Sequence, residues 1–328
     1  MAKKSILVAR AVFPSVIARL AEHFELETNQ ADVLWRQDEL IRQLAGKDGV
    51  FTTSSENINA QVLAACPQLR IAASMAVGYN NFDLAAMTAA GVLATNAPDV
   101  LTETTADMGF ALLMATARRV SEGEAFLRSG QWRAWRHDML LGCDVYGATL
   151  GILGMGRIGR AIARRGALGF GMRVIYHNRS RLDGALEAES SARYVSKETV
   201  FREADHVMVV LPYTAENHHV VGASDIALMK PTATLVNIGR GGLVDEDALA
   251  SALAAHRILG AGLDVFEGEP QVNPALLALK NVVLTPHIGS ATAPTREAMA
   301  NLAADNLIGY LLHGQPRTPL NPEVLMRR

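Results

Sequence analysis

The sequence predicts an α/β protein built on two parallel β-sheets. Ten short runs rich in Val, Ile and Leu recur along the chain, and longer segments with helical spacing separate most of them. Continuous apolar runs suit strands covered on both faces, and the alternation of strand and helix favours parallel pairing. A chain of 328 residues is long enough for two domains of about 150 residues each. The expected strands are residues 6–9, 50–53, 69–73, 92–95, 150–154, 173–177, 206–211, 234–238, 259–266 and 281–285.

The composition excludes several classes of protein. Hydrophobic residues make up 49% of the chain, and 31 basic against 33 acidic side chains leave a net charge of -2. This balance argues against disorder and against a basic surface for nucleic acid or membrane. Cys66 and Cys143 match no paired metal-ligand spacing, so reduced thiols and no metal site are expected. The first apolar run ends at Arg10, too early for a secretory signal, and a cytoplasmic protein is expected.

The domain boundaries are indicated by a break and by a returning helix. Ala97-Pro98-Asp99 interrupts the chain before a helical segment that begins near Thr102, and a second helical pattern follows residue 294. We expect a discontinuous outer domain of residues 1–100 plus 289–328, an inner domain of residues 101–288, and a cleft between them. Residues 120–149 contain two of the three tryptophans. This excursion indicates either a homodimer contact or packing on the parent domain.

A glycine pattern follows one of the expected strands. The run at 150–154 leads into Gly154-Met155-Gly156-Arg157-Ile158-Gly159, and residues with helical character come next. In such a turn the first glycine permits the bend, the second lets backbone approach a pyrophosphate, and the third lets helix and strand pack closely. The phosphates would sit at the helix N-terminus. The pattern predicts dinucleotide binding, with an adenosyl-dependent methyltransferase and an ordinary strand-to-helix turn as alternatives.

The end of the next strand indicates which dinucleotide is preferred. An NAD site usually has a carboxylate about twenty residues past the glycines, where it accepts hydrogen bonds from the ribose. Here the chain reads His177-Asn178-Arg179-Ser180-Arg181, without an acid. Two guanidinium groups and a hydroxyl suit a 2′-phosphate. NADPH is therefore predicted over NADH, unless the arginines belong only to a solvated turn.

Three ionisable residues follow later strands. Arg240, Glu269 and His287 each come just after an apolar run, and ligands of open parallel sheets bind beyond the carboxyl ends of strands. Each residue alone has an ordinary explanation, as a surface charge, a turn residue or a structural histidine. Together, downstream of a dinucleotide turn, they form a set suited to hydride transfer on a 2-oxo acid.

Longer motifs resemble the D-isomer-specific 2-hydroxyacid dehydrogenase family over nearly the whole chain. The segments at 77–83 and 101–104, with Ser180 and its flanking arginines, most resemble its glyoxylate/hydroxypyruvate reductase B group, also called 2-ketogluconate reductases. The resemblance implies two Rossmann-like or flavodoxin-like domains, of which the inner binds dinucleotide and the outer binds substrate. The family motifs are Gly154 to Gly159, Asn237-Ile238-Gly239-Arg240-Gly241, Gly262-Leu263-Asp264-Val265-Phe266-Glu267-Gly268-Glu269-Pro270 and Pro286-His287-Ile288-Gly289-Ser290.

The resemblance also implies a role for each site residue. Arg240 would hold the substrate carboxylate, His287 would be the acid/base, and Glu269 would pair with the histidine. Val77 and Gly78 would offer backbone N–H groups to the substrate. The implied cofactor contacts, with Asp264 on the nicotinamide carboxamide, are Thr105, Gly154, Met155, Gly156, Arg157, Ile158, Gly159, Asn178, Arg179, Ser180, Arg181, Leu211, Pro212, Ile238, Gly239, Arg240, Asp264, His287 and Gly289.

The implied reaction is reduction of glyoxylate, hydroxypyruvate or 2-ketogluconate to a D-2-hydroxy acid by a homodimer, with NADPH preferred and NADH possible. Hydride transfer leaves charge on the ketone oxygen, so a proton donor and a cation there lower the barrier. A carboxylate beside the histidine favours imidazolium, and lower pH should therefore favour reduction. Trp135 resembles a tryptophan that reaches the neighbouring subunit's substrate in related reductases, but is not placed in the catalytic set. A dinucleotide-sensing protein like the family's corepressors, without turnover, is the alternative.

Overall fold

The computed structural model describes residues 3–327, and their contacts divide the chain into two compact units. The first unit runs as far as Leu101 and resumes at Thr292, while the second unit comprises Thr102–Ala291. Each unit contains one sheet in which every pairing between strands is parallel. The predicted α/β class with two parallel sheets is therefore confirmed.

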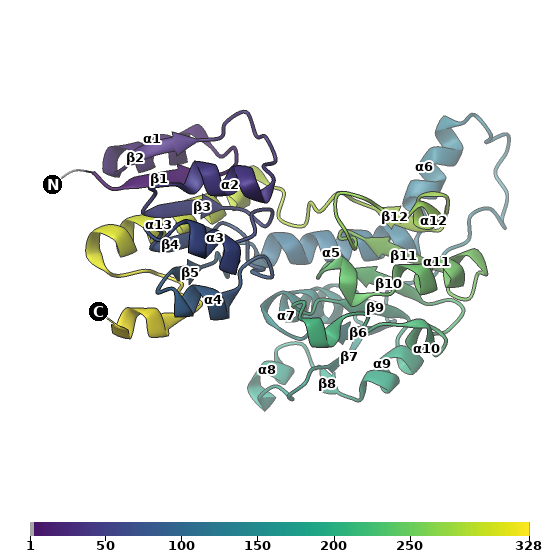
Figure 1. The fold of residues 1–328 in the computed structure, drawn as a ribbon. Helices are drawn as coiled ribbons and strands as arrows, with labels where there is room; N and C mark the ends of the chain where they lie inside the picture. The colour runs from purple at the N-terminus through teal and green to yellow at the C-terminus, as the bar shows by residue number, and fades with distance from the viewer. Residues whose placement is uncertain (1–2, 328) are drawn as a thin grey trace. The chain divides into compact units, whose positions relative to one another are not determined.

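The first unit has a five-stranded sheet in the order β2-β1-β3-β4-β5, with helices on both faces (Figure 1). Side chains from neighbouring positions of one strand enter different cores: Ile6 packs with α1 and α13, and Leu7 packs with α2, α3 and α4. The strands are β1 (Ser5–Val8), β2 (Glu25–Thr28), β3 (Gly49–Thr52), β4 (Ile71–Ser74) and β5 (Leu93–Thr95). The helices are α1 (Pro14–His23), α2 (Gln37–Leu44), α3 (Ala60–Ala65), α4 (Leu84–Ala89), α13 (Ala293–His313) and η4 (Pro322–Arg327).

The second unit has a seven-stranded sheet in the order β12-β11-β10-β9-β6-β7-β8. Its strands are β6 (Thr149–Leu153), β7 (Arg173–His177), β8 (Arg193–Tyr194), β9 (His206–Val209), β10 (Thr234–Asn237), β11 (Gly260–Leu263) and β12 (Val282–Leu284). The direction of chain progression reverses between β6 and β9. In open parallel sheets the crevice beyond the carboxyl ends of strands at such a reversal is where ligands bind.

Helices cover both faces of this second sheet (Figure 1). One face packs against α5 (Thr102–Ala117) and α7 (Arg157–Arg164), which continues into η1 (Arg165–Gly169). The opposite face packs against α9 (Lys197–Glu203), α10 (Ala223–Ile226), α11 (Glu246–Ala254) and α12 (Pro274–Leu277). The remaining short elements are α6 (Val120–Arg128), α8 (Gly184–Ala188), η2 (Ala215–Asn217) and η3 (Gly241–Leu243).

All ten predicted strands are confirmed to within a few residues, but two strands of the described chain were not predicted. β2 and β8 each lie at the edge of a sheet. An edge strand pairs on one side only, and the faces of β2 are largely exposed, with only Leu26 half-buried. These strands therefore lack the apolar run that marks a strand buried on both faces.

The segment that contains the tryptophans extends away from the second sheet (Figure 1). α6 has no fully buried residue, and residues 129–138 after it are all exposed. Trp132 and Trp135 expose 50% and 76% of their surfaces. Cys66 and Cys143 are both free thiols. Throughout residues 3–327, each helix is too short or too polar to cross a membrane.

Candidate active site

The glycine turn after β6 needs its first and third glycines for physical reasons. Gly154 has a φ of +101°, and a Cβ added there would lie 2.7 Å from the carbonyl carbon of Val210. A Cβ on Gly159 would lie 2.2 Å from the carbonyl oxygen of Gly154. Gly156 is exposed and has open space where its Cβ would be. The turn is thus closed where strand and helix meet and open where a ligand would approach.

The helix that follows is suited to bind an anion. α7 begins after Gly156, an N-cap residue that makes no side-chain hydrogen bond to the first turn. The N–H groups of such a first turn carry the positive end of the helix dipole and bind phosphate readily. The residues present therefore fit the pyrophosphate of a dinucleotide.

Predicted cofactor residues from three strands meet at this edge of the sheet. Leu211 follows β9, and its backbone lies against both Gly154 after β6 and Gly239 after β10. A Cβ on Gly154 would lie 2.9 Å from the Leu211 nitrogen, and one on Gly239 would lie 2.8 Å from the Leu211 oxygen. Ile238, just before Gly239, is buried, and Pro212 is exposed. The three backbone segments can approach one another closely here because side chains are absent at the two glycines.

Asp264 holds the segment that carries the histidine. Its Oδ1 accepts hydrogen bonds from Thr285 Oγ1 at 2.6 Å and from the Ile288 N–H at 2.8 Å, and its Oδ2 accepts one from the Gly289 N–H at 2.7 Å. Thr105 lies beside Gly289, 3.4 Å from a Cβ built there. Sequence reasoning placed Asp264 at the nicotinamide and missed this positioning role. The sequence did contain a signal for this role: an acid follows one strand, and a Thr-Pro-His segment follows the next strand.

His287 and Glu269 form a hydrogen-bonded pair. Nδ1 of His287 lies 2.8 Å from Oε2 of Glu269, and the side chains are 39% and 34% exposed. Glu269 Oε1 also accepts the backbone N–H of Phe266 at 2.9 Å. The backbone of His287 has a φ of +51°, and its N–H donates to the carbonyl of Asp264. A histidine in this uncommon conformation must be held by its surroundings.

Arg240 follows β10 and is half-buried. Asn237 shapes its turn: the side-chain amide donates to the Arg240 carbonyl at 2.9 Å and accepts from the Gly239 N–H at 3.0 Å. Nη1 of Arg240 donates to the Gly239 carbonyl at 2.7 Å. Burial lowers the pKa of Arg240, and the charge of Glu269 opposes that effect. Arginine titrates so far above neutrality that the group remains a cation.

The three predicted catalytic residues are electrostatically coupled. Burial by itself would raise the pKa of Glu269, but the hydrogen bond and charge of His287, the Phe266 N–H and the charge of Arg240 lower it overall. Glu269 is therefore an ionised carboxylate at neutral pH, which can only accept hydrogen bonds. It follows that Nδ1 of His287 carries the shared proton and that Nε2 is the nitrogen directed to other partners.

The segment after β7 is tied to the glycine turn. Oδ1 of Asn178 accepts the Met155 N–H at 2.7 Å, which joins the end of β7 to the start of the turn. Arg179 and Ser180 are exposed beyond Asn178. The predicted recognition loop is thus anchored at its base and accessible at its tip.

Arg181 has a partner that sequence reasoning did not find. Its Nε and Nη2 donate to the two oxygens of Glu187 at 2.9 and 2.8 Å, and the buried Tyr176 hydroxyl donates to the same carboxylate at 2.6 Å. The hydrogen bonds from Arg181 have the largest effect on the pKa of Glu187, and with the bond from Tyr176 they lower it to about 2. The guanidinium of Arg181 therefore already has a bidentate carboxylate partner, although its side chain is 66% exposed.

Val77 and Gly78 belong to the first unit, on the segment after β4. Both are half-buried, and the Val77 carbonyl accepts the side-chain amide of Asn96 at 2.7 Å. The segment is thereby fixed to the chain that follows β5. The backbone N–H groups on which the prediction depends belong to this anchored segment.

The second unit has the fold and the polar groups of a dinucleotide-dependent dehydrogenase. The comparison with protein families then names the group: the model of the NAD binding domain of D-isomer specific 2-hydroxyacid dehydrogenases matches residues 110–289, and the chain belongs to this family. The resemblance read from the sequence is confirmed, and the methyltransferase alternative is excluded. The protein is an oxidoreductase that interconverts 2-oxo acids and 2-hydroxy acids.

Known relatives match along nearly the whole chain. A glyoxylate reductase of Thermococcus onnurineus is 47% identical over 98% of this chain and 97% of its own length. A glyoxylate reductase of Pyrococcus furiosus is 47% identical over 99% and 98%. The chain is also similar to a solved structure from Sinorhizobium meliloti, an NADPH-dependent glyoxylate/hydroxypyruvate reductase in complex with NADP and malonate. That comparison has a TM-score of 0.84 and 37% identity and covers 97% of each chain.

Proposed function

We propose that this chain reduces small 2-oxo acids to D-2-hydroxy acids, with NADPH preferred over NADH. Glyoxylate, hydroxypyruvate and 2-ketogluconate are the proposed substrates. The observation that carries the proposal is the 2.8 Å pair of His287 and Glu269, coupled to the charge of Arg240, in the unit that contains the glycine turn. The names of the Thermococcus and Sinorhizobium relatives support glyoxylate and hydroxypyruvate as substrates.

Arg240 is the residue suited to hold the substrate. Its planar guanidinium can donate two parallel hydrogen bonds to a carboxylate, and its charge stabilises negative charge that develops on the neighbouring carbonyl oxygen. Partial burial strengthens both effects, because electrostatic interactions are less screened away from water. Val77 and Gly78, which belong to the first unit, are proposed to offer backbone N–H donors to substrate.

His287 is suited to deliver the proton. Because Nδ1 donates to Glu269, Nε2 of the imidazolium is free to donate to the substrate oxygen as charge develops there. Glu269 stabilises the positive ring and fixes its orientation, and Asp264 fixes the backbone beneath it. The reduced nicotinamide of the cofactor supplies the hydride when it is bound. The same groups serve the reverse reaction, with His287 accepting the proton.

The NADPH preference predicts a selective effect of the arginines after β7. Replacing Arg179 and Arg181 together by alanine should raise the KM for NADPH about tenfold or more, the loss expected for hydrogen bonds to a charged group. The KM for NADH should change far less, because NADH lacks the 2′-phosphate. Steady-state kinetics with both cofactors measure the difference.

Single variants separate the two arginines. Arg181 already donates to Glu187, so Arg179→Ala should account for more of the NADPH effect than Arg181→Ala. Arg193→Ala is the matched control, because Arg193 is an exposed arginine of β8 paired with Glu203. Equal changes in KM for NADPH and NADH would refute phosphate recognition by this loop.

A substrate panel tests the proposed activity. Oxidation of NADPH and of NADH is followed with glyoxylate, hydroxypyruvate and 2-ketogluconate, and NADPH binding is measured in parallel. Turnover with at least one of these acids, faster with NADPH, is expected. Tight NADPH binding without turnover of any 2-oxo acid would instead favour a dinucleotide-sensing protein.

We also propose that the protein is a homodimer. The exposed tryptophans of the segment at 120–149 are large apolar side chains of the kind enriched in interfaces. Light scattering on the purified protein is expected to give the mass of two chains.

A further inference from the structure

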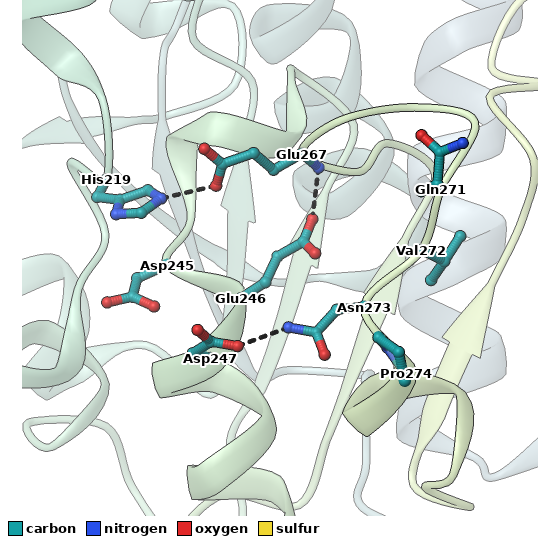
Figure 2. A pocket seen from close by; sticks show the side chains of 9 residues that line it. All are labelled: His219, Asp245, Glu246, Asp247, Glu267, Gln271, Val272, Asn273 and Pro274. Carbon is teal, nitrogen blue, oxygen red and sulfur yellow. Dashed lines mark hydrogen bonds and ion pairs between the residues drawn. The ribbon is translucent and has the colours of Figure 1, made fainter.

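A surface pocket outside the catalytic set lies beside the segments that follow β9 and β11 (Figure 2). Its volume is about 440 Å³. Among the described residues that line it are four carboxylates, and neither lysine nor arginine is present. The lining consists of His219, Asp245, Glu246, Asp247, Glu267, Gln271, Val272, Asn273 and Pro274.

Two histidines converge on one of these carboxylates. Nε2 of His219 lies 2.8 Å from Oε2 of Glu267, and Nε2 of the adjacent His218 lies 3.7 Å from Oε1. A dashed line in Figure 2 marks the contact between His219 and Glu267. The two imidazole rings stack with their centroids 3.8 Å apart. One potential ligand atom from each of the three residues lies within 4.8 Å of the others. Small side-chain rotations would therefore bring all three atoms onto one ion.

The surroundings orient this cluster. Nδ1 of His218 lies 3.2 Å from the Tyr213 hydroxyl, which leaves its Nε2 for the carboxylate. The backbone of His219 has a φ of +51°, and its N–H donates to the Gly242 carbonyl at 2.8 Å. A histidine that ligates a metal commonly uses its second ring nitrogen for a hydrogen bond to a neighbouring group, as Nδ1 of His218 does with the Tyr213 hydroxyl.

The charges of the pocket favour a cation. Within the described part of the chain, the two histidines are the ion-pair partners of Glu267. Glu246 places a further carboxylate beside this residue, because its Oε1 accepts the backbone N–H of Glu267 at 2.6 Å. Carboxylates thus crowd this pocket without a lysine or arginine among its lining residues.

We propose that His218, His219 and Glu267 form a binding site for a divalent transition-metal ion, with Zn²⁺ as the best fit. Two imidazole nitrogens and one carboxylate are a donor set that Zn²⁺ accepts, with water at the remaining position. Imidazole ligands select Zn²⁺ and its neighbours over Mg²⁺ and Ca²⁺, which prefer oxygen. The three side chains are 42%, 36% and 44% exposed, so an ion can reach them from solvent.

The bound ion would join two segments of the second unit. His218 and His219 follow β9, whereas Glu267 follows β11 and lies two residues before Glu269. The ion therefore links the two loops in the folded chain, and an ion that binds the folded state raises thermal stability. This inference concerns metal binding and does not depend on the proposed substrate or cofactor.

The test is a Zn²⁺ titration of the full chain after treatment with a chelator and dialysis. Calorimetry is expected to show one equivalent of Zn²⁺ bound at this site, with a rise in the melting temperature, and no comparable binding of Mg²⁺. His218→Asn and Glu267→Gln should each weaken this binding by about tenfold or more, since loss of even an outer-shell partner has effects of that size. His219→Asn should do the same, because asparagine tolerates the left-handed backbone at this position.

Two controls separate this site from other histidines. His256 is exposed and also has a positive φ, of 48°, so His256→Asn makes the same chemical change elsewhere and should keep the bound equivalent. His287→Gln should also keep it, which excludes binding at the His287–Glu269 pair. Circular dichroism of the metal-free variants verifies that each is folded, and the visible absorption of bound Co²⁺ gives a second readout.

The result can overturn the proposal in two ways. The wild-type chain could bind no Zn²⁺ beyond the amount bound by the His218→Asn, His219→Asn double variant. Alternatively, the bound equivalent could persist in both His218→Asn and Glu267→Gln but disappear in His256→Asn or His287→Gln.

Discussion

Replacing His287 by glutamine is expected to lower turnover by about 10²–10⁴-fold, the loss typical of removing a general acid. A glutamine amide can still donate a hydrogen bond to Glu269, but it has no proton to transfer to the substrate oxygen. NADPH binding should remain nearly intact, because the glycine turn and the segment after β7 are untouched. Steady-state turnover with glyoxylate and fluorescence titration with NADPH measure the two effects.

Glu269→Gln is the companion variant that separates proton transfer from charge. The lowered pKa of Glu269 means that the wild-type carboxylate supports the imidazolium down to acidic pH and loses this effect only when it is itself protonated. Glutamine removes the charge but keeps the size. The loss of turnover as pH falls into the acidic range, where the wild-type Glu269 carboxylate becomes protonated, should therefore be absent in Glu269→Gln. Unchanged turnover in His287→Gln would contradict the assignment of the proton donor.

The central strands could be predicted from sequence because a strand that is buried on both faces is rich in apolar residues. Every residue of β6, β9, β10 and β11 is buried, and each strand is centred on apolar residues. β2 and β8 could not be found in this way. Their pairing depends on a neighbouring strand, β1 or β7, that supplies hydrogen bonds from one side.

The grouping of the three proposed catalytic residues could be predicted because parallel strands place their carboxyl ends at one edge. Arg240, Glu269 and His287 follow β10, β11 and β12, which are neighbours in the sheet. Strand order makes these residues meet, whatever the details of the turns between them.

The groups that hold the set in place depend on those details. Asp264 binds three donors of the segment at 285–289, and Asn237 shapes the Arg240 turn, through bonds that only the folded loops reveal. Glu187 lies in α8, six residues after Arg181, and reaches its guanidinium through a contact that depends on where this helix begins. His219 and Glu267 are 48 residues apart in the sequence, and they meet because the loops after β9 and β11 lie side by side. Short ligand-spacing patterns in a sequence do not detect a pair so far apart.

Gly241 tests whether the loops bearing Arg240 and Glu269 pack as the structure shows. A Cβ at this position would lie 1.9 Å from the carbonyl carbon of Phe266 and 2.1 Å from the nitrogen of Glu267. Both are backbone atoms, so no side-chain rotation can relieve the overlap. Gly241→Ala must instead displace the segment after β10, which contains Arg240, or the segment after β11, which leads to Glu269.

The expected result for Gly241→Ala is a loss of both stability and activity. Overpacking of this kind should lower the free energy of unfolding by about 3 kcal/mol, and a catalytic group moved by about 1 Å should lower kcat/KM roughly 10²-fold. Urea denaturation and steady-state kinetics with glyoxylate measure these changes. Gly169→Ala is the matched control, because Gly169 is exposed, ends η1, and has nothing within 4 Å of its Cβ position. If Gly241→Ala were as stable and as active as Gly169→Ala, the two loops could not be in contact, and the coupling of Arg240 to the Glu269–His287 pair would lose its structural basis.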